Sequence, residues 1–242
     1  MKPTKTLFVT AALILGAMGA QAADFVQNGN FLTVQLKQHQ NYGPSQIRLQ
    51  VVNDRIIRVQ ATAEQGFRNK QSLIIVPQNS KAQYKVEEQG DDLIITTAAM
   101  RAVLNEATGQ ITFYDLKGQV LLNEVAQGGK TFKPFTVPDR EIGVDIAKVP
   151  EAQKHGWSWR ALFDSPDNEA FYGLGQHQSE ELNMKGKNED LFQYNTKVSV
   201  PFVISNKNYG ILWDSYSYCR WGNPDDYLQL NRAFKLYDKD GK

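Results

Sequence analysis

Few residues of this chain have the types and spacing that catalysis or metal binding requires. None of its three histidines has the i, i+4 spacing that places two imidazoles on one helix face; they are His39, His155 and His177. Adjacent carboxylates occur at Glu180-Glu181, Glu189-Asp190 and Asp225-Asp226. Neighbouring acids on a strand point to opposite faces, and acids on a loop are usually solvated, so we expect these pairs at the surface. The sequence therefore predicts no catalytic residue and no metal site.

The motifs of nucleophilic and cofactor-dependent enzymes are missing from the sequence as well. It contains no G-x-S-x-G elbow, no H-E-x-x-H motif and no P-loop. Gly173-Leu174-Gly175 is only a fragment of the dinucleotide-binding fingerprint, because a third glycine and a following helix are lacking. We interpret these glycines as a tight turn and expect no cofactor.

The last third of the chain is rich in aromatic residues, with amide and carboxylate side chains between them. Such a mixture suits sugars, because the C–H face of a sugar ring stacks on an aromatic ring while its hydroxyls form hydrogen bonds. In a β-sandwich, however, Trp and Tyr also supply large buried area, and for each residue taken alone we favour the core. The residues are Trp157, Trp159, Trp213, Tyr216, Tyr218 and Trp221.

Short strands are the elements that must position these residues. Apolar and polar residues alternate in segments that recur roughly every 8–12 residues, separated by turns rich in Gly, Asn and Asp. This spacing predicts an all-β fold, an antiparallel β-sandwich that forms one domain from about residue 24. The stretch 128–155 mixes Lys, Gly, Pro and Glu, and we interpret it as a crossing loop.

Composition and length exclude several classes of protein. With 27 basic and 26 acidic residues, the 242-residue chain lacks the positive surplus typical of nucleic-acid binding. Its single cysteine, Cys219, excludes a disulfide within the chain and a Cys-rich zinc site. A (β/α)8 barrel alone takes about 250 residues, so a sandwich and a barrel do not both fit into this length.

The N-terminus has the three parts of a secretory signal peptide. A basic start with Lys2 and Lys5 precedes an apolar run from Leu7 to Ala20, and Ala20-Gln21-Ala22 forms the cleavage box. The run is shorter than the roughly 20 apolar residues of a membrane-spanning helix. We predict a signal peptide over residues 1–22, a mature domain over residues 23–242, export to the periplasm or the medium, and no membrane partner.

Three segments of the C-terminal third resemble one known family. Residues 171–176 read F-Y-G-L-G-Q, residues 193–196 read Q-Y-N-T, and residues 201–214 read P-F-V-I-S-N-K-N-Y-G-I-L-W-D. In this order they resemble the N-terminal, galactose-mutarotase-like β-sandwich of glycoside hydrolase family 31. Gln176, the short loop after it and the Q-Y-N-T segment are most similar to the α-xylosidase branch of that family.

The resemblance implies a retaining α-glycosidase whose two catalytic Asp residues lie on a (β/α)8 barrel after the sandwich. Nothing in the chain matches the W-x-D-M-N-E motif of the nucleophile, and Trp213-Asp214 falls within the sandwich. We therefore expect an accessory domain that is inactive alone. Its implied partners are the missing barrel and an oligosaccharide with α-linked xylose or glucose. The implied substrate-binding residues are Gln193, Tyr194 and Asn195.

The resemblance also implies that the β-sandwich is incomplete at its C-terminal end. In α-xylosidase-like relatives a carbohydrate-binding domain interrupts the sandwich after a segment similar to residues 236–242, so we expect further strands beyond this point. The alternative is a self-sufficient carbohydrate-binding or mutarotase-like protein, since sugar mutarotases share this architecture. A mutarotase should present paired histidines and a carboxylate as acid and base, and the three histidines do not supply a convincing set.

Overall fold

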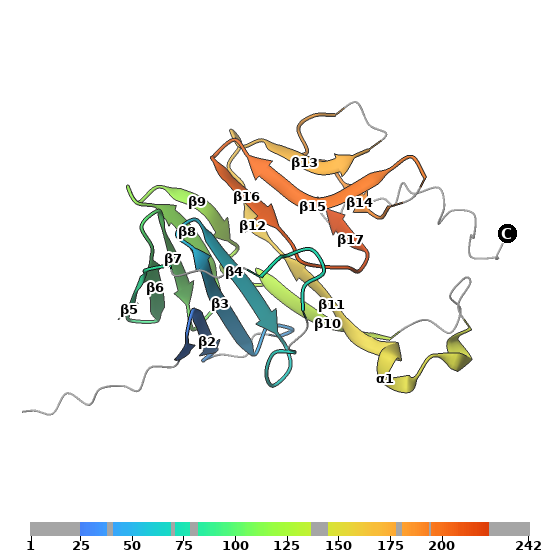
Figure 1. Ribbon diagram of the computed structural model, residues 1–242, viewed down its shortest axis with the longest axis horizontal. Helices are drawn as coiled ribbons and strands as arrows, with labels where there is room; N and C mark the ends of the chain where they lie inside the picture. Colours follow the sequence, from blue (N-terminus) through green and yellow to red (C-terminus); the bar gives the residue numbers. More distant parts are fainter. Residues whose placement is uncertain are drawn as a thin grey trace, which may run out of the picture.

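The computed structural model describes residues 25–37, 41–68, 71–77, 82–136, 145–177, 181–193 and 195–222. Their strands form two lobes and a two-stranded ribbon (Figure 1). No helix in these ranges is long and apolar enough to cross a membrane. The predicted signal peptide and insertion point lie outside the described residues, as do His39, Glu180, Tyr194, Asp225 and Asp226.

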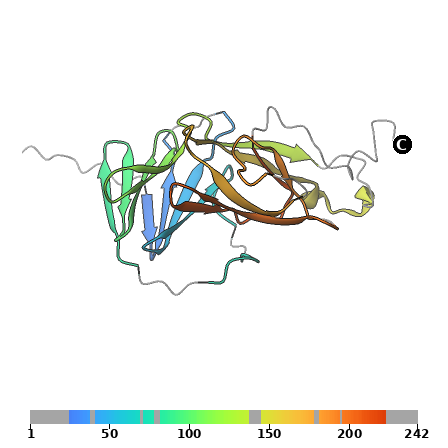
Figure 2. The same cartoon turned by 90° about the horizontal axis from the view of Figure 1, so that it is seen from above.

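Two facing antiparallel sheets form the first lobe, drawn in blue and green in Figure 2. The first sheet has the order β1-β2-β3-β4, and the second has the order β12-β9-β8-β7-β6-β5. Fully buried aliphatic side chains from both sheets make one core: Leu32, Val34, Ile47, Leu49, Leu93, Ile95, Leu104 and Ile111. This packing confirms the predicted antiparallel sandwich. The strands are β1 (Phe25–Asn28), β2 (Phe31–Gln35), β3 (Gln46–Asn53), β4 (Ile56–Thr62), β5 (Lys85–Gln89), β6 (Asp92–Thr96), β7 (Met100–Asn105), β8 (Ile111–Asp115), β9 (Val120–Glu124) and β12 (Phe163–Asp164).

The second lobe contains the segments that carry the family resemblance. In one sheet β15 lies between β13 and β16, and in the other β14 pairs with β17. A smaller core consists of Phe171, Leu174, Met184, Leu191 and Val203. The strands are β13 (Phe171–Gln176), β14 (Glu189–Leu191), β15 (Val198–Ser205), β16 (Tyr209–Leu212) and β17 (Cys219–Trp221).

Two of the six aromatic residues considered above pack in this second core. The rings of Trp213 and Trp221 stack with centroids 6.0 Å apart and planes 13° apart, which confirms the core prediction for both. The prediction is wrong for the other four, because they lie on the ribbon and on the loop before β17 instead of between sheets. The exposed residues are Trp157, Trp159, Tyr216 and Tyr218.

The stretch 128–155 is not the crossing loop that its composition predicted. It contains β10 (Lys130–Thr136), η1 (Ile146–Lys148) and α1 (Glu151–Lys154), and β10 pairs along its whole length with β11 (His155–Ala161). Figure 1 shows this ribbon extending away from the sheets. Pro134 lies within β10, which pairs with β11 on one side only. Such an edge strand tolerates proline, because N–H groups on its open side need no partner strand. Lys, Gly and Pro are depleted in strands, so the composition of this stretch did not predict β10.

Strand β13 approaches β15 so closely that only glycine fits at two of its positions. Gly173 and Gly175 have φ angles of +133° and +99°, and an added Cβ would lie 2.6 Å from the Phe202 oxygen and 2.1 Å from the Val198 oxygen. The pairing register shifts between the two glycines, which makes a bulge. Leu174 between them is fully buried. These glycines therefore bend a strand, and the tight turn predicted from the sequence is wrong.

Strand β15 presents its more apolar side to solvent. Val203 and Ser205 are buried, whereas the alternate residues from Val198 to Ile204 are exposed. Tyr172 on β13 pairs with Ile204, and Leu212 on β16 pairs with Phe202, so exposed apolar residues continue across all three strands. We call this surface the apolar face; its residues are Tyr172, Val198, Val200, Phe202, Ile204 and Leu212.

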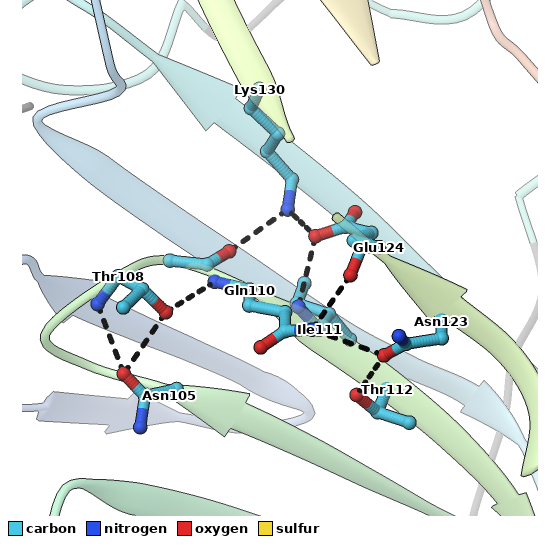
Figure 3. A network of polar contacts seen from close by, with 9 residues as sticks. Asn105, Thr108, Gln110, Ile111, Thr112, Asn123, Glu124 and Lys130 are labelled. Atoms are coloured by element: carbon cyan, nitrogen blue, oxygen red, sulfur yellow. Dashed lines mark hydrogen bonds and ion pairs between the residues drawn. The ribbon is translucent and has the colours of Figure 1, made fainter. Parts of the chain in front are cut away.

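A buried ion pair connects the end of β9 with the start of β10 (Figure 3). The Glu124 carboxylate contacts the Lys130 ammonium and accepts the Ile111 N–H at 2.9 Å, while Lys130 also donates to the Gly109 oxygen at 3.0 Å. Burial raises the pKa of Glu124 and lowers the pKa of Lys130, and the charge of each partner opposes the effect. The pair therefore ties the ribbon to the turn between β7 and β8.

We expect Gly175→Ala to destabilise the chain more than Gly118→Ala does. Both glycines have positive φ, so each alanine carries a left-handed penalty of about 1–2 kcal/mol. Only at Gly175 does the new Cβ also collide with backbone, and we expect at least about 2 kcal/mol of further loss. Urea unfolding followed by tryptophan fluorescence measures both variants. Equal losses would contradict the role assigned to the close approach of β13 and β15.

Lys130→Met should destabilise the chain by about 3–5 kcal/mol at neutral pH, because it leaves the Glu124 carboxylate buried without its cation. The exposed Lys117→Met is the control and should change stability by less than about 0.5 kcal/mol.

The loss should shrink as the pH falls. Burial raises the pKa of Glu124 and Lys130 opposes this rise, so the variant should have a higher Glu124 pKa than the wild type. A raised carboxyl pKa in the folded state gives stability that is present at low pH and is lost as the pH rises through that pKa, so the variant loses more than the wild type as the pH rises. A loss for Lys130→Met that is independent of pH between about 5 and 7 would contradict the assignment to an unpaired carboxylate.

Candidate functional site

The loop between β14 and β15 carries the residues that the sequence assigns to substrate. Gln193 and Asn195 are exposed on this loop, and Tyr194 lies outside the described residues. Asn195 has a φ angle of +23°, in a region that asparagine enters more readily than most residues. An exposed amide can donate to one sugar hydroxyl and accept from another. The structure thus places Gln193 and Asn195 on one loop with their side chains exposed.

A buried lysine closes the base of this loop. Lys197 is 8% exposed, and its Nζ contacts Glu189 Oε1 and the main-chain oxygen of Asp190. The ion pair between Glu189 and Lys197 therefore joins the two ends of the loop. Because both groups are shielded from water, loss of either partner would leave the other as an uncompensated buried charge.

His177 adds a second basic group to the same carboxylate. Its Nε2 donates to the Leu174 oxygen at 2.7 Å, and its Nδ1 lies 3.1 Å from Glu189 Oε1. His177 thereby connects the β13 bulge to the base of the loop.

Glu189 and Asp190 are not the solvated acids that the sequence predicted. Asp190 is 4% exposed, and the Tyr218 hydroxyl donates to its Oδ1. The pairing of β14 with β17 covers the strand, and each carboxylate meets a partner from outside β14. An unpaired buried charge would cost several kcal/mol, so these partners are what makes burial possible. They come from other segments, and the local pattern therefore could not reveal them.

The remaining histidine of the described part has a local role. His155 is exposed, with Nε2 2.9 Å from Glu151 and Nδ1 3.2 Å from Thr136. No group of three His, Cys, Asp or Glu side chains within the described ranges could hold a metal ion. His155 and His177 thus take part in separate contacts.

Asp214, which follows Trp213 in the sequence, joins the two lobes. Arg58 Nη2 on β4 lies 2.7 Å from its Oδ2, and Ser72 Oγ donates to its Oδ1 at 2.8 Å. Nearby, the Tyr216 hydroxyl accepts the Leu73 N–H at 2.7 Å. A carboxylate held by two donors in this way anchors structure, which agrees with the expectation that Trp213-Asp214 belongs to the sandwich.

Sequence reasoning missed Glu169, a buried carboxylate in front of β13. The hydroxyls of Ser165, Ser205 and Tyr209 all donate to it. Burial and the hydrogen bond to Glu169 raise the pKa of Tyr209. Glu169 thereby fastens the start of β13 to β15 and β16. No local motif surrounds it, because its partners lie up to 40 residues away.

Comparison with known proteins identifies the fold that holds this loop. Residues 46–221 match the family model of the glycosyl hydrolase 31 N-terminal galactose mutarotase-like domain. The chain belongs to this family. The matched stretch runs from β3 to β17 and so includes the ribbon, the second lobe and all of the first lobe except β1 and β2. The resemblance inferred from residues 171–214 is confirmed.

Several relatives share this domain. The structure of a family 31 α-xylosidase from Xanthomonas citri is 37% identical, with a TM-score of 0.68 over 84% of this chain. A family 31 α-xylosidase from a soil metagenome, complexed with xylose, is 25% identical, with a TM-score of 0.61 over 82% of this chain. An uncharacterised family 31 glucosidase from Pseudescherichia vulneris is 27% identical over 178 residues, or 70% of this chain.

The chain spans only part of each of these proteins. It covers 20% and 29% of the two α-xylosidases and 32% of the glucosidase. The family 31 domain described above therefore corresponds to one part of a much longer relative. What such relatives do as whole enzymes does not follow from this part alone.

Proposed function

We propose that the chain is the N-terminal domain of a retaining α-glycosidase, of the α-xylosidase kind, that borders the pocket for the terminal sugar. One observation carries this proposal: the loop between β14 and β15, closed at its base by Lys197 and Glu189, exposes the amides of Gln193 and Asn195. It lies in a domain 37% identical to part of an α-xylosidase. The sugar contacts would come from Gln193, Tyr194 and Asn195. The substrate class is an oligosaccharide with α-linked xylose or glucose.

The carboxylates of the described residues support a non-catalytic role. A retaining glycosidase needs two carboxyl groups about 5–5.5 Å apart that face the scissile bond. Here the buried acids of the described residues already have structural partners: Glu106 pairs with Lys37, Glu124 pairs with Lys130, Glu169 accepts three hydroxyls, and Asp190 accepts the Tyr218 hydroxyl. The partly buried Glu189 and Asp214 pair with Lys197 and Arg58. Catalysis would come from a (β/α)8 barrel, and this chain alone should be inactive.

The apolar face supports a partner domain. Aliphatic and aromatic side chains gathered on an open sheet face mark a surface that another protein layer covers. On β15 the exposed side carries Val198, Val200, Phe202 and Ile204, whereas the two buried residues on the other side are Val203 and Ser205. The partner that we propose for this face is the catalytic barrel.

The structure does not favour the alternative of a self-sufficient mutarotase-like protein. Such an enzyme needs an accessible acid and base at one site. His177 donates to the main-chain oxygen of Leu174, whereas His155 begins β11 of the ribbon and contacts Glu151 of α1. No observation on the described residues brings two histidines and a carboxylate together.

The test is a complete family 31 α-xylosidase in which residues 25–222, which include every described strand, replace the corresponding domain. Asn195→Ala should raise KM for an aryl α-xyloside by about two- to tenfold, the value of one neutral hydrogen bond, without lowering the melting temperature. Gln119→Ala, an exposed amide on the β8–β9 turn, is the matched control and should leave kinetics unchanged.

Two results would overturn parts of the proposal. Unchanged KM and kcat for Asn195→Ala would remove Asn195 from the sugar site. Hydrolysis by the chain alone, abolished by a substitution within it, would contradict the accessory role.

We also propose that the protein is exported, because residues 1–22 combine a basic start, an apolar run and an A-x-A box. N-terminal sequencing of the protein from a bacterial periplasm or culture medium should begin at Ala23. Recovery only from the cytoplasm with Met1 retained would contradict export.

A further inference from the structure

The outer side of the β1–β4 sheet carries a groove of about 570 Å³. Strand register places its residues in two rows, because directly paired residues share a face. Thr33, Arg48 and Gln60 form one row, and Phe31, Gln50 and Arg58 form the next. The groove is lined by Asn28, Phe31, Thr33, Arg48, Arg58, Gln60, Arg68 and Gln71. Neither Gln193 nor Asn195 belongs to it.

Positive charge in this groove is only partly balanced. Arg58 is paired with Asp214 at 2.7 Å, and Arg68 is paired with Glu64 at 2.8 Å. Arg48 has no carboxylate within 4.0 Å among the described residues. Among the residues that the structure describes, the Arg48 guanidinium is therefore the one in this groove without an acidic partner.

Arg48 is held in place by neutral groups. Its Nε donates to Gln60 Oε1 at 3.0 Å, and its Cζ lies 4.3 Å from the centre of the Phe67 ring and 5.3 Å from that of Phe31. Its two terminal nitrogens donate to no side chain or backbone of the described ranges. Burial and the charge of Arg58 both lower the pKa of Arg48, so an anion at this point would relieve an electrostatic cost.

We propose that this groove binds the carboxylate of an acidic sugar, a uronic acid residue of a glycan. The two terminal nitrogens of an immobilised guanidinium match the two oxygens of a carboxylate. Gln60 uses only its oxygen on Arg48, which leaves its amide nitrogen to donate to a sugar hydroxyl, and the Asn28 and Gln71 amides line the same groove. The Phe31 ring beside them can contact the C–H face of the sugar. This site is independent of the loop at residues 192–196.

The test is an NMR titration of the chain with sodium glucuronate, read from the Arg48 Nε–H and Gln60 side-chain amide signals. Both signals should shift and saturate in the millimolar range, and added salt should weaken binding. Glucose, which lacks the carboxylate, should shift neither. Arg48→Gln should weaken glucuronate binding by about tenfold or more, and Arg48→Lys should recover only part of it, because lysine keeps the charge but not the planar fork.

Arg101→Gln is the matched control, because Arg101 also lies over an aromatic ring, Tyr114, but on the other sheet. It should leave glucuronate binding unchanged, and circular dichroism should show that all variants remain folded. Absence of shifts with glucuronate, or equal binding by Arg48→Gln, would overturn the site. Inorganic phosphate that binds as tightly as glucuronate would overturn the assignment to an acidic sugar, because a site for any anion needs no sugar contacts.

Discussion

The packing of the second lobe requires glycine at two positions of β13, because no side chain fits there. At Gly173 and Gly175 the β13 backbone lies against the main-chain oxygens of β15, where any Cβ would collide. The resulting bulge places Leu174 in the core and sets which residues of β15 face inward. Because β15 begins directly after Lys197, the same pairing fixes one end of the candidate substrate loop. The glycines of the F-Y-G-L-G-Q segment thus act on the site through strand geometry and not through contact with a ligand.

Buried charges provide the second level of organisation. The Glu124–Lys130 pair ties the ribbon to the first lobe, Asp214 and Arg58 tie the lobes together, and Glu189 with Lys197 closes the loop. Burial of such pairs costs desolvation energy, so they add less to stability than their geometry implies, but breaking one leaves an uncompensated charge. They therefore favour one arrangement of sheets and loops over others that apolar packing alone would permit.

Strands with regular alternation could be predicted from the sequence, and features set by distant partners could not. The segments near Leu32, Ile47, Leu93 and Ile111 alternate with period two, so the first lobe followed from local pattern. Strand β10 was missed because its composition opposes strand formation and only its pairing with β11 stabilises it. Burial of Asp190 and exposure of Trp157 depend on which elements cover them, which no local window contains. The positions of Gln193 and Asn195 on an exposed loop agree with the sequence, but their contact with a sugar stays a prediction.

The central claim is that the bulged β13–β15–β16 sheet presents the apolar face to a catalytic barrel. Hydroxyl-radical footprinting with mass spectrometry measures this directly, by comparing the isolated chain with a complete enzyme that contains this domain. We expect Tyr172, Phe202 and Leu212 to be labelled in the isolated chain and strongly protected in the complete enzyme, with exposed Val26 on the first lobe labelled equally in both. Equal labelling of the apolar face in both proteins would contradict the account.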